Sequence, residues 1–252
     1  MRHSGRTSIG GKKSGFETTH WSEIEDARTQ DDVRRNIVID SLIKKYWKPI
    51  YCYLRRKGYN NEPAKDLTQG FFHEIVLGKD LVRQADEAKG RFRTFLLTAL
   101  NHYVTSVYRA KVAGKRHPKD GIVSLEEFDE ESMHLMARDM GPEDAFTYIW
   151  ASVLMDSVLA EVKEGCIRDD KTIHWEVFSA RVLDPIIAGV EPVAVTDLCR
   201  QFGVETKAKI SNMVVTVKRR LQTATARRVR QHVGSDEEVE QEIQDLMTIL
   251  SR

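Results

Sequence analysis

The sequence has few cysteines and no long apolar run. Its three cysteines, Cys52, Cys166 and Cys199, lie far apart without a Cys-x-x-Cys pair, so neither a disulfide framework nor a zinc site can be inferred. No stretch approaches the eighteen or so uninterrupted apolar residues of a membrane span, and the basic N-terminus has no apolar segment behind it. We therefore expect no membrane span and no secretory signal, and a reducing, cytoplasmic setting.

Motifs of the common enzyme classes are also missing. In the segment FFHEIV, His73 and Glu74 are not followed by a histidine four positions after the first, so the zinc-protease pattern fails. The chain has no glycine-rich phosphate loop, no Gly-x-Ser-x-Gly and no dinucleotide fingerprint, and its eight histidines are dispersed. We expect a protein without enzymatic activity, with no catalytic residue, no bound metal and no cofactor.

What the sequence does contain is charge sorted into blocks. The formal net charge is only +1, yet residues 89–117 hold seven Lys or Arg and no acid. Residues 120–144 hold nine acids and one Arg. Residues 200–230 hold nine basic residues against Glu205, and the tail 236–252 holds six acids and one Arg. Such segregation is typical of an interaction surface for a charged partner, nucleic acid above all.

Apolar residues recur at helical spacing in most of the chain, and strand-type alternation is almost absent, which predicts an all-α fold. Helices are expected at 38–56 with a kink at Pro49, from Asn60 or Asn61 to Val76, along the first basic block, and from Pro142 onward. Further helices are expected at 172–187, 193–202, 206–231 and 237–250. A short helix carrying Trp21 and Ile24 would be capped by Thr19.

Composition and breaks divide the chain into two helical lobes joined by an acidic linker. The divisions are a disordered arm (1–17), a first lobe (18–117), the linker (118–141), a second lobe (142–234) and an acidic amphipathic helix (235–252).

The second basic block has the layout of a helix-turn-helix. In VTDLCRQFGVETKAKISNMVVTVKRRL, a short helix ends at Phe202, Gly203 supplies the turn, and a basic helix follows. Cys199 is small enough to let the helices cross closely. A common core is expected from Leu198, Phe202, Val204, Ile210 and Met213. The alternative is an ordinary helical hairpin with a solvated basic face.

The first basic block interleaves aromatic and basic residues, which suits single-stranded nucleic acid because cations follow phosphates while rings stack on unpaired bases. Phe92, Phe95 and Tyr103 lie on the apolar stripe and are expected in the core. His102, Tyr108 and Arg109 are then the better candidates for an exposed surface. The alternative is a solvated helix face.

The C-terminal helix has an apolar side and an acidic side. Its apolar residues are expected to pack on the helix with Trp150, Leu154 and Val158. They are Val239, Ile243, Leu246, Met247 and Leu250. The helix either only completes the core, or its acids Glu238, Glu242 and Asp245 also shield a basic cluster, which comprises Arg227, Arg228 and Arg230.

The order of these segments resembles bacterial RNA polymerase sigma factors of the extracytoplasmic-function type, within the sigma-70 superfamily. The first lobe is similar to sigma region two in IDSLIKKYWKPIYCYLRRKGY, EPAKDLTQGFFHEIV and GRFRTFLLTALNHYVTSVYRAK. The second resembles sigma region four, from GPEDAFTYIWASVLMDSVLAEV to VEQEIQDLMTIL. TTHWSEI and GPEDAFTYIWA resemble a sigma-like group of planctomycetes.

The resemblance implies a factor that directs core polymerase to promoters. Its partners would be the clamp helices and flap of the core enzyme, promoter DNA and, as a further candidate, an anti-sigma protein, with no membrane partner. The polymerase-binding residues implied are Asp66, Leu67, Gln69 and Phe72. The family usually has an acid where this chain has Gly70, which costs a helix about 1 kcal/mol relative to alanine.

The resemblance also implies two DNA-reading sets. The minus-10 element would be opened by Arg91, Arg93, Asn101, His102, Tyr108, Arg109 and Lys111. The minus-35 element would be read by Lys207, Lys209, Ser211, Asn212, Lys218 and Arg219. The acidic linker would imitate nucleic acid near the RNA exit path. A different possibility is a helix-turn-helix regulator that binds duplex DNA but no longer binds core polymerase.

Overall fold

We describe the protein from a computed structural model of the whole chain. The structure describes residues 32–78, 81–85, 91–113, 140–230 and 236–250. All regular elements in these residues are helices, which confirms the all-α expectation for this part of the chain. The predicted arm, the helix capped by Thr19 and almost all of the acidic linker lie outside the described residues.

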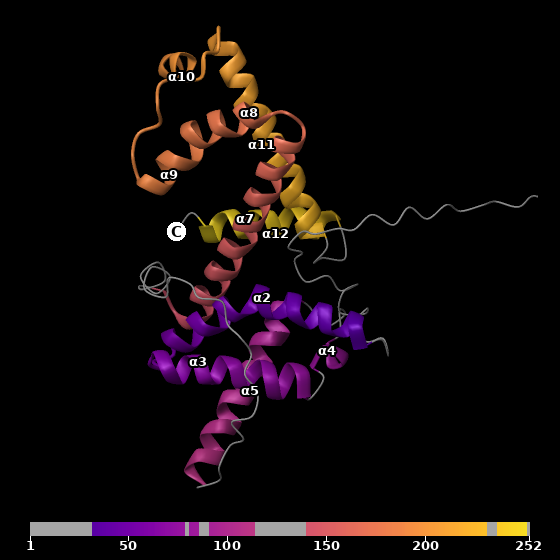
Figure 1. Cartoon of the computed structure of the whole chain (residues 1–252). Coiled ribbons are helices and arrows are strands. Elements are labelled where there is room, and N and C mark those ends of the chain that lie inside the picture. Colours follow the sequence, from indigo (N-terminus) through magenta and orange to yellow (C-terminus); the bar gives the residue numbers. More distant parts are fainter. Residues whose placement is uncertain (1–31, 79–80, 86–90, 114–139, 231–235, 251–252) are drawn as a thin grey trace, which may run out of the picture.

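Within the described residues, the first five elements in chain order are α2 (Asp32–Arg56), α3 (Asn61–Gly70), the π-helix η1 (Phe71–Gly78), α4 (Leu81–Gln84) and α5 (Phe92–Val112). The later elements are α7 (Pro142–Arg168), α8 (Thr172–Phe178), the π-helix η3 (Ser179–Leu183), α9 (Asp184–Ala188), α10 (Val195–Phe202), α11 (Lys207–Arg230) and α12 (Asp236–Leu250) (Figure 1).

Helix α2 follows the predicted apolar stripe but begins at Asp32 rather than Val38. It contains Pro49 and continues to Arg56. The chain then turns at Gly58, whose φ of 93° is a conformation that glycine adopts without a steric penalty. The stripe residues Leu42, Tyr46, Trp47, Ile50, Tyr51 and Leu54 are all buried, as expected.

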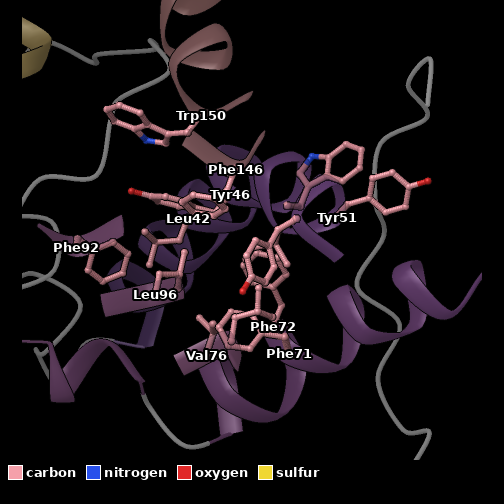
Figure 2. Close-up of a cluster of buried hydrophobic side chains, with 14 of the residues drawn as sticks. Leu42, Tyr46, Tyr51, Phe71, Phe72, Val76, Phe92, Leu96, Phe146 and Trp150 are labelled. Carbon is pink, nitrogen blue, oxygen red and sulfur yellow. The ribbon is translucent and has the colours of Figure 1, made fainter. Parts of the chain in front are cut away.

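The largest core lies between α2, η1, α5, the first half of α7 and α12. Tyr46 of α2 stands at its centre, with its ring 5.8 Å from that of Phe92 and 6.5 Å from that of Phe146 (Figure 2). Full burial of an apolar side chain of this size contributes roughly 1.5–3 kcal/mol to folding. Aromatic contacts between distant segments therefore hold α5 and α7 against α2.

Helix α7 belongs to two cores. Its first half, with Phe146, Trp150 and Leu154, packs in the core around α2, while Val158 and Val162 pack with α8 and α11. Figure 1 shows α7 running from the α2–α5 group toward α8 and α11. The boundary between the cores thus falls within α7, whereas the sequence predicted a boundary at its start, residue 142.

The same helix has a composition typical of membrane spans. Among the described helices, α7 is the one that is long and apolar enough to cross a membrane, judged by length and composition alone. A buried core helix of a soluble protein passes the same test, and 44% of the most apolar window of α7 is buried in this fold.

Candidate nucleic-acid interface

Helix α5 separates its two kinds of residue by side. Phe92, Leu96 and Tyr103 are buried, and Phe95 is partly buried against the same core. The side chains of His102, Tyr108, Arg109 and Lys111 are exposed, Tyr108 to 64%. This division is the one that the sequence predicted, and it leaves a basic and aromatic surface along the C-terminal half of the helix.

Asn101 lies at the edge of that surface in a polar junction. The Tyr53 hydroxyl donates a hydrogen bond to Asn101 Oδ1 at 2.7 Å, and Lys57 Nζ donates to the same oxygen at 2.8 Å. Tyr53 also lies 3.4 Å from Glu143 Oε1, at the start of α7. The amide oxygen of Asn101 is therefore already engaged within the protein, which the sequence pattern did not indicate.

Arg91 and Arg93, both included in the minus-10 set, are engaged by acids of α12; the Arg93 side chain is 11% exposed, whereas that of Arg91 remains 39% exposed. Arg91 Nη2 lies 2.8 Å from Glu242 Oε2 and 3.2 Å from Asp245 Oδ2. Arg93 pairs with both oxygens of Glu242, its Nη2 lying 3.3 Å from Oε2. The guanidinium group of Arg93 also lies 4.4 Å from the ring centre of Trp150. Helix α12 thus covers the basic start of α5.

Two of the three acids predicted on α12, Glu242 and Asp245, pair with arginines at the start of α5. Glu242, whose side chain is only 1% exposed, pairs with Arg91 and Arg93, and Asp245 pairs with Arg91. The side chain of Glu238, the third predicted acid, lies outside the described part of the structure. Arg227 and Arg228 of α11 pair with Glu161 of α7, Arg228 Nη2 at 2.7 Å. Hydrogen bonding from Gln241 and the nearby Arg91 lower the pKa of Asp245, which favours its charged form.

The apolar side of α12 packs as predicted. Val239 and Leu246 are buried in the same core as Trp150 and Leu154 of α7. Met247, which was expected on this side, is instead 66% exposed.

The second basic block forms two helices joined by a tight turn. Gly203 ends α10 with a φ of 63°, and the N–H of Val204 donates to the carbonyl oxygen of Cys199 at 2.9 Å. Thr206 Oγ1 accepts a hydrogen bond from the N–H of Lys209 at 3.2 Å, which caps the start of α11. These local contacts fix the turn.

The predicted common core of α10 and α11 is present. Leu198 and Ile210 are fully buried, and Phe202, Val204 and Met213 pack against them. Val177 of α8 completes the cluster, so a third helix supports the pair.

The minus-35 set is exposed, and most of it lies on one side of α11. All six side chains are exposed to solvent. Lys207, Ser211 and Lys218 recur at spacings of four and seven residues, and Asn212 and Arg219 follow the adjacent row. Lys209 lies apart from them and pairs with Glu205, whose pKa is lowered by that hydrogen bond.

One residue of the predicted polymerase-binding set is in the core. Phe72 is 1% exposed and packs edge-on against Phe71 at 5.7 Å, so it cannot reach a partner without disrupting the fold. Its inclusion was wrong, because η1 turns it inward. Asp66 is exposed, and Leu67 and Gln69 are partly buried at the surface of α3.

Gly70, where the resembling family has an acid, has a steric role. A Cβ atom at this position would lie 2.2 Å from the hydroxyl oxygen of Tyr103 on α5. Burial and the neighbouring Glu74 raise the pKa of Tyr103 well above its usual range, so the hydroxyl stays protonated. Glycine at this point therefore lets α5 pack closely against the α3–η1 junction.

Sequence reasoning missed Lys57 as part of the candidate interface. It expected Trp150 only as a core residue and assigned Glu242 to the basic end of α11, whereas both residues contact Arg93. The acids of α12 and the arginines of α5 are oppositely charged blocks, and that was the available signal. The spacing along the chain is too long for a local pattern to pair them. In the described residues, no group of three His, Cys, Asp or Glu is placed to hold a metal ion.

Comparisons with known proteins identified no relative: no family model, no curated protein and no solved structure matches the chain. A function must therefore be inferred from the residues themselves.

Proposed function

We propose that the protein is a sigma-like transcription initiation factor that directs core RNA polymerase to promoters. In this proposal α10 and α11 read the minus-35 element, and the outer side of α5 holds the minus-10 strand. The two lobes would correspond to sigma regions two and four, with the acidic residues 118–141 between them.

The observation that carries the proposal is the geometry of α10 and α11. A left-handed glycine turn and a common apolar core fix the second helix against the first. Beside that core, an exposed flank of α11 presents Lys207, Ser211 and Lys218 in one row. A row of basic and hydrogen-bonding side chains on a supported helix is suited to phosphates and base edges in a DNA major groove.

The surface of α5 supports the single-strand part of the proposal. Tyr108, Arg109 and Lys111 are exposed near the end of the helix, so a ring for base stacking and cations for phosphates are adjacent. Duplex binding by α11 and single-strand binding by α5 are the two activities that promoter recognition and opening require.

A second candidate is a helix-turn-helix regulator that does not bind polymerase. It is favoured by the α3–η1 junction, where Phe72 is buried and Tyr103 occupies the space that a side chain at Gly70 would need. Only Asp66, Leu67 and Gln69 of the expected motif remain to contact a partner, and the usual acid is absent.

Co-elution with core polymerase separates the two candidates. The sigma-like function predicts that the purified chain elutes with bacterial core enzyme at physiological salt, and that the reconstituted complex initiates at mapped promoters. The double variant Asp66→Ala with Gln69→Ala should elute separately while keeping its helical content. Glu62→Ala, an exposed acid on the same helix, is the matched control and should still co-elute.

If the wild-type chain binds duplex DNA but never co-elutes with core enzyme, the regulator is correct. If it binds neither, both functions are excluded.

A further inference from the structure

The start of α5 is built as an anion site. Arg91 and Arg93 direct their guanidinium groups to one carboxylate, that of Glu242. Arg93 is held in place from its other side by the ring of Trp150 at 4.4 Å. Paired guanidinium groups fixed in this way bind the oxygens of a phosphate as well as those of a carboxylate.

This anion site continues into the exposed surface of α5. Arg91, Thr98, His102 and Arg109 follow one another at spacings of seven, four and seven residues, which places them on one side of the helix. The last three are exposed, whereas Arg91 is partly exposed and pairs with Glu242 and Asp245. From Arg91 to Arg109 the row would measure about 27 Å at the α-helical rise, long enough for several nucleotides.

Helix α12 brings acids to this site from the other end of the chain. It is anchored by Val239 and Leu246, while Glu242 and Asp245 occupy the two arginines. It also contacts α11 and α7 within the same core. A carboxylate pair on a short helix is a reasonable internal substitute for two backbone phosphates.

We propose that the start of α5 is a phosphate-binding site for single-stranded nucleic acid that α12 covers in this structure with its own carboxylates. This inference rests on the single-strand function proposed for α5 and adds its regulation. Nucleic acid and α12 compete for Arg91 and Arg93, so the apparent affinity of the chain is reduced by the fraction of molecules in which α12 is docked.

The test uses the full-length chain with one isosteric change, Glu242→Gln. Glu240→Gln removes the same charge from an exposed position on the same helix and is the matched control. Two probes are titrated: a labelled twenty-nucleotide oligothymidylate and inorganic polyphosphate. Thermal melting of each variant establishes that it is folded.

We expect Glu242→Gln to bind both probes about a hundredfold more tightly than wild type and Glu240→Gln, as a docked fraction of about 99 in 100 requires. The salt dependence for the oligonucleotide should steepen by roughly 0.7 log units for each additional phosphate that the variant binds. Adding Arg91→Ala to Glu242→Gln should abolish the tighter binding. If Glu242→Gln acted only by loosening the structure, the double variant would still bind more tightly than wild type.

The outcomes separate the inference from the proposed function. Tighter binding of polyphosphate with no binding of the oligonucleotide by any variant retains the covered anion site but excludes single-strand binding. A folded Glu242→Gln chain that binds both probes as Glu240→Gln does overturns the inference and leaves the proposed function standing.

If Glu242→Gln does not fold, Asp245→Asn replaces it, because Asp245 is partly exposed and forms its ion pair with Arg91. Tighter binding than that of Glu240→Gln supports the competition, and equal binding overturns it.

Discussion

The two basic blocks, residues 89–117 around α5 and residues 200–230 around α11, hold seven and nine Lys or Arg, but these charges have different surroundings in the fold. On α11, Lys207, Lys218 and Arg219 face solvent. At the start of α5, Arg91 and Arg93 are bound by acids of α12. The open basic surface of α5 is therefore in its C-terminal half.

The difference shows that a block of charge indicates a surface only where no other segment of the chain has the opposite charge within reach. At the end of α11, Glu161 of α7 likewise neutralises basic side chains, because it pairs with Arg227 and Arg228. Each basic helix therefore has one end committed to the fold and a remaining surface available for a partner.

The strongest test of this contrast replaces one cation on each helix. Arg93→Ala should lower the free energy of unfolding by about 3 kcal/mol, because buried Glu242 loses one of its two arginines and Trp150 loses its cation. Lys218→Ala should change it by less than about 0.5 kcal/mol. Chemical denaturation of both variants measures the difference, and equal effects would mean that α12 does not hold α5 in solution.

Gly70 and Gly203 position α5 and α11, and replacing each with alanine should lower the free energy of unfolding for a different reason. Gly70→Ala should cost about 2 kcal/mol, because its Cβ meets the hydroxyl of Tyr103. Gly203→Ala should cost about 1 kcal/mol through its positive φ, since nothing lies within 4 Å of a Cβ there. Thermal and denaturant unfolding would measure both.

The double variant Gly70→Ala with Tyr103→Phe is the control for this prediction. Removing the hydroxyl should restore most of the loss at Gly70, whereas Tyr103→Phe should not improve Gly203→Ala. Failure to rescue Gly70→Ala would show that α5 does not pack on α3 as described.

The open surfaces should prefer different nucleic acids. Tyr108→Ala should weaken single-strand binding by roughly 1.5 kcal/mol if the ring stacks on a base, with duplex binding unchanged. Tyr108→Phe keeps the ring and should bind as wild type does. Lys218→Ala with Arg219→Ala should instead weaken duplex binding and flatten its salt dependence, with Lys163→Ala on α7 as the control. Fluorescence anisotropy with a labelled single strand and a labelled duplex measures both affinities. If Tyr108→Ala weakened duplex binding, or the α11 variant weakened single-strand binding, the assignment of the two surfaces would be contradicted.

The two regions should also lose stability over different pH ranges, with small amplitudes. Burial, followed by the charges of Lys171 and Arg220, lowers the pKa of His174 near α11. As pH falls, His174 is therefore protonated more readily in the unfolded chain than in the folded one, and the free energy of unfolding decreases. The contribution of neutral His174 to the stability of the fold is complete above about pH 6.5 and is lost as pH falls below that value.

The pKa of Asp245, at the α5 contact, is also lowered, and its contribution is present above about pH 3.9 and lost as pH falls further. Melting temperatures from pH 7 to 3 should show the first loss disappear in His174→Gln and the second in Asp245→Asn. A single transition unaffected by either variant would contradict the separation.

The sequence alone determined most helices and which side of each is apolar. The stripe of α2, the buried and exposed sides of α5, the opening of α7 at Pro142 and the turn at Gly203 were all predicted. These features depend on residues within a few positions of one another, where helical periodicity and the conformational preferences of proline and glycine act directly.

Only the tertiary structure decided which charges remain available and where the cores divide. Arg93 and Glu242 are 149 positions apart, and Gly70 meets Tyr103 across two helices. The split of α7 between two cores likewise depends on what packs against each half. Periodicity within a segment gives the direction of a side chain but not the identity of the segment opposite, because that choice is made by packing and charge across the whole chain.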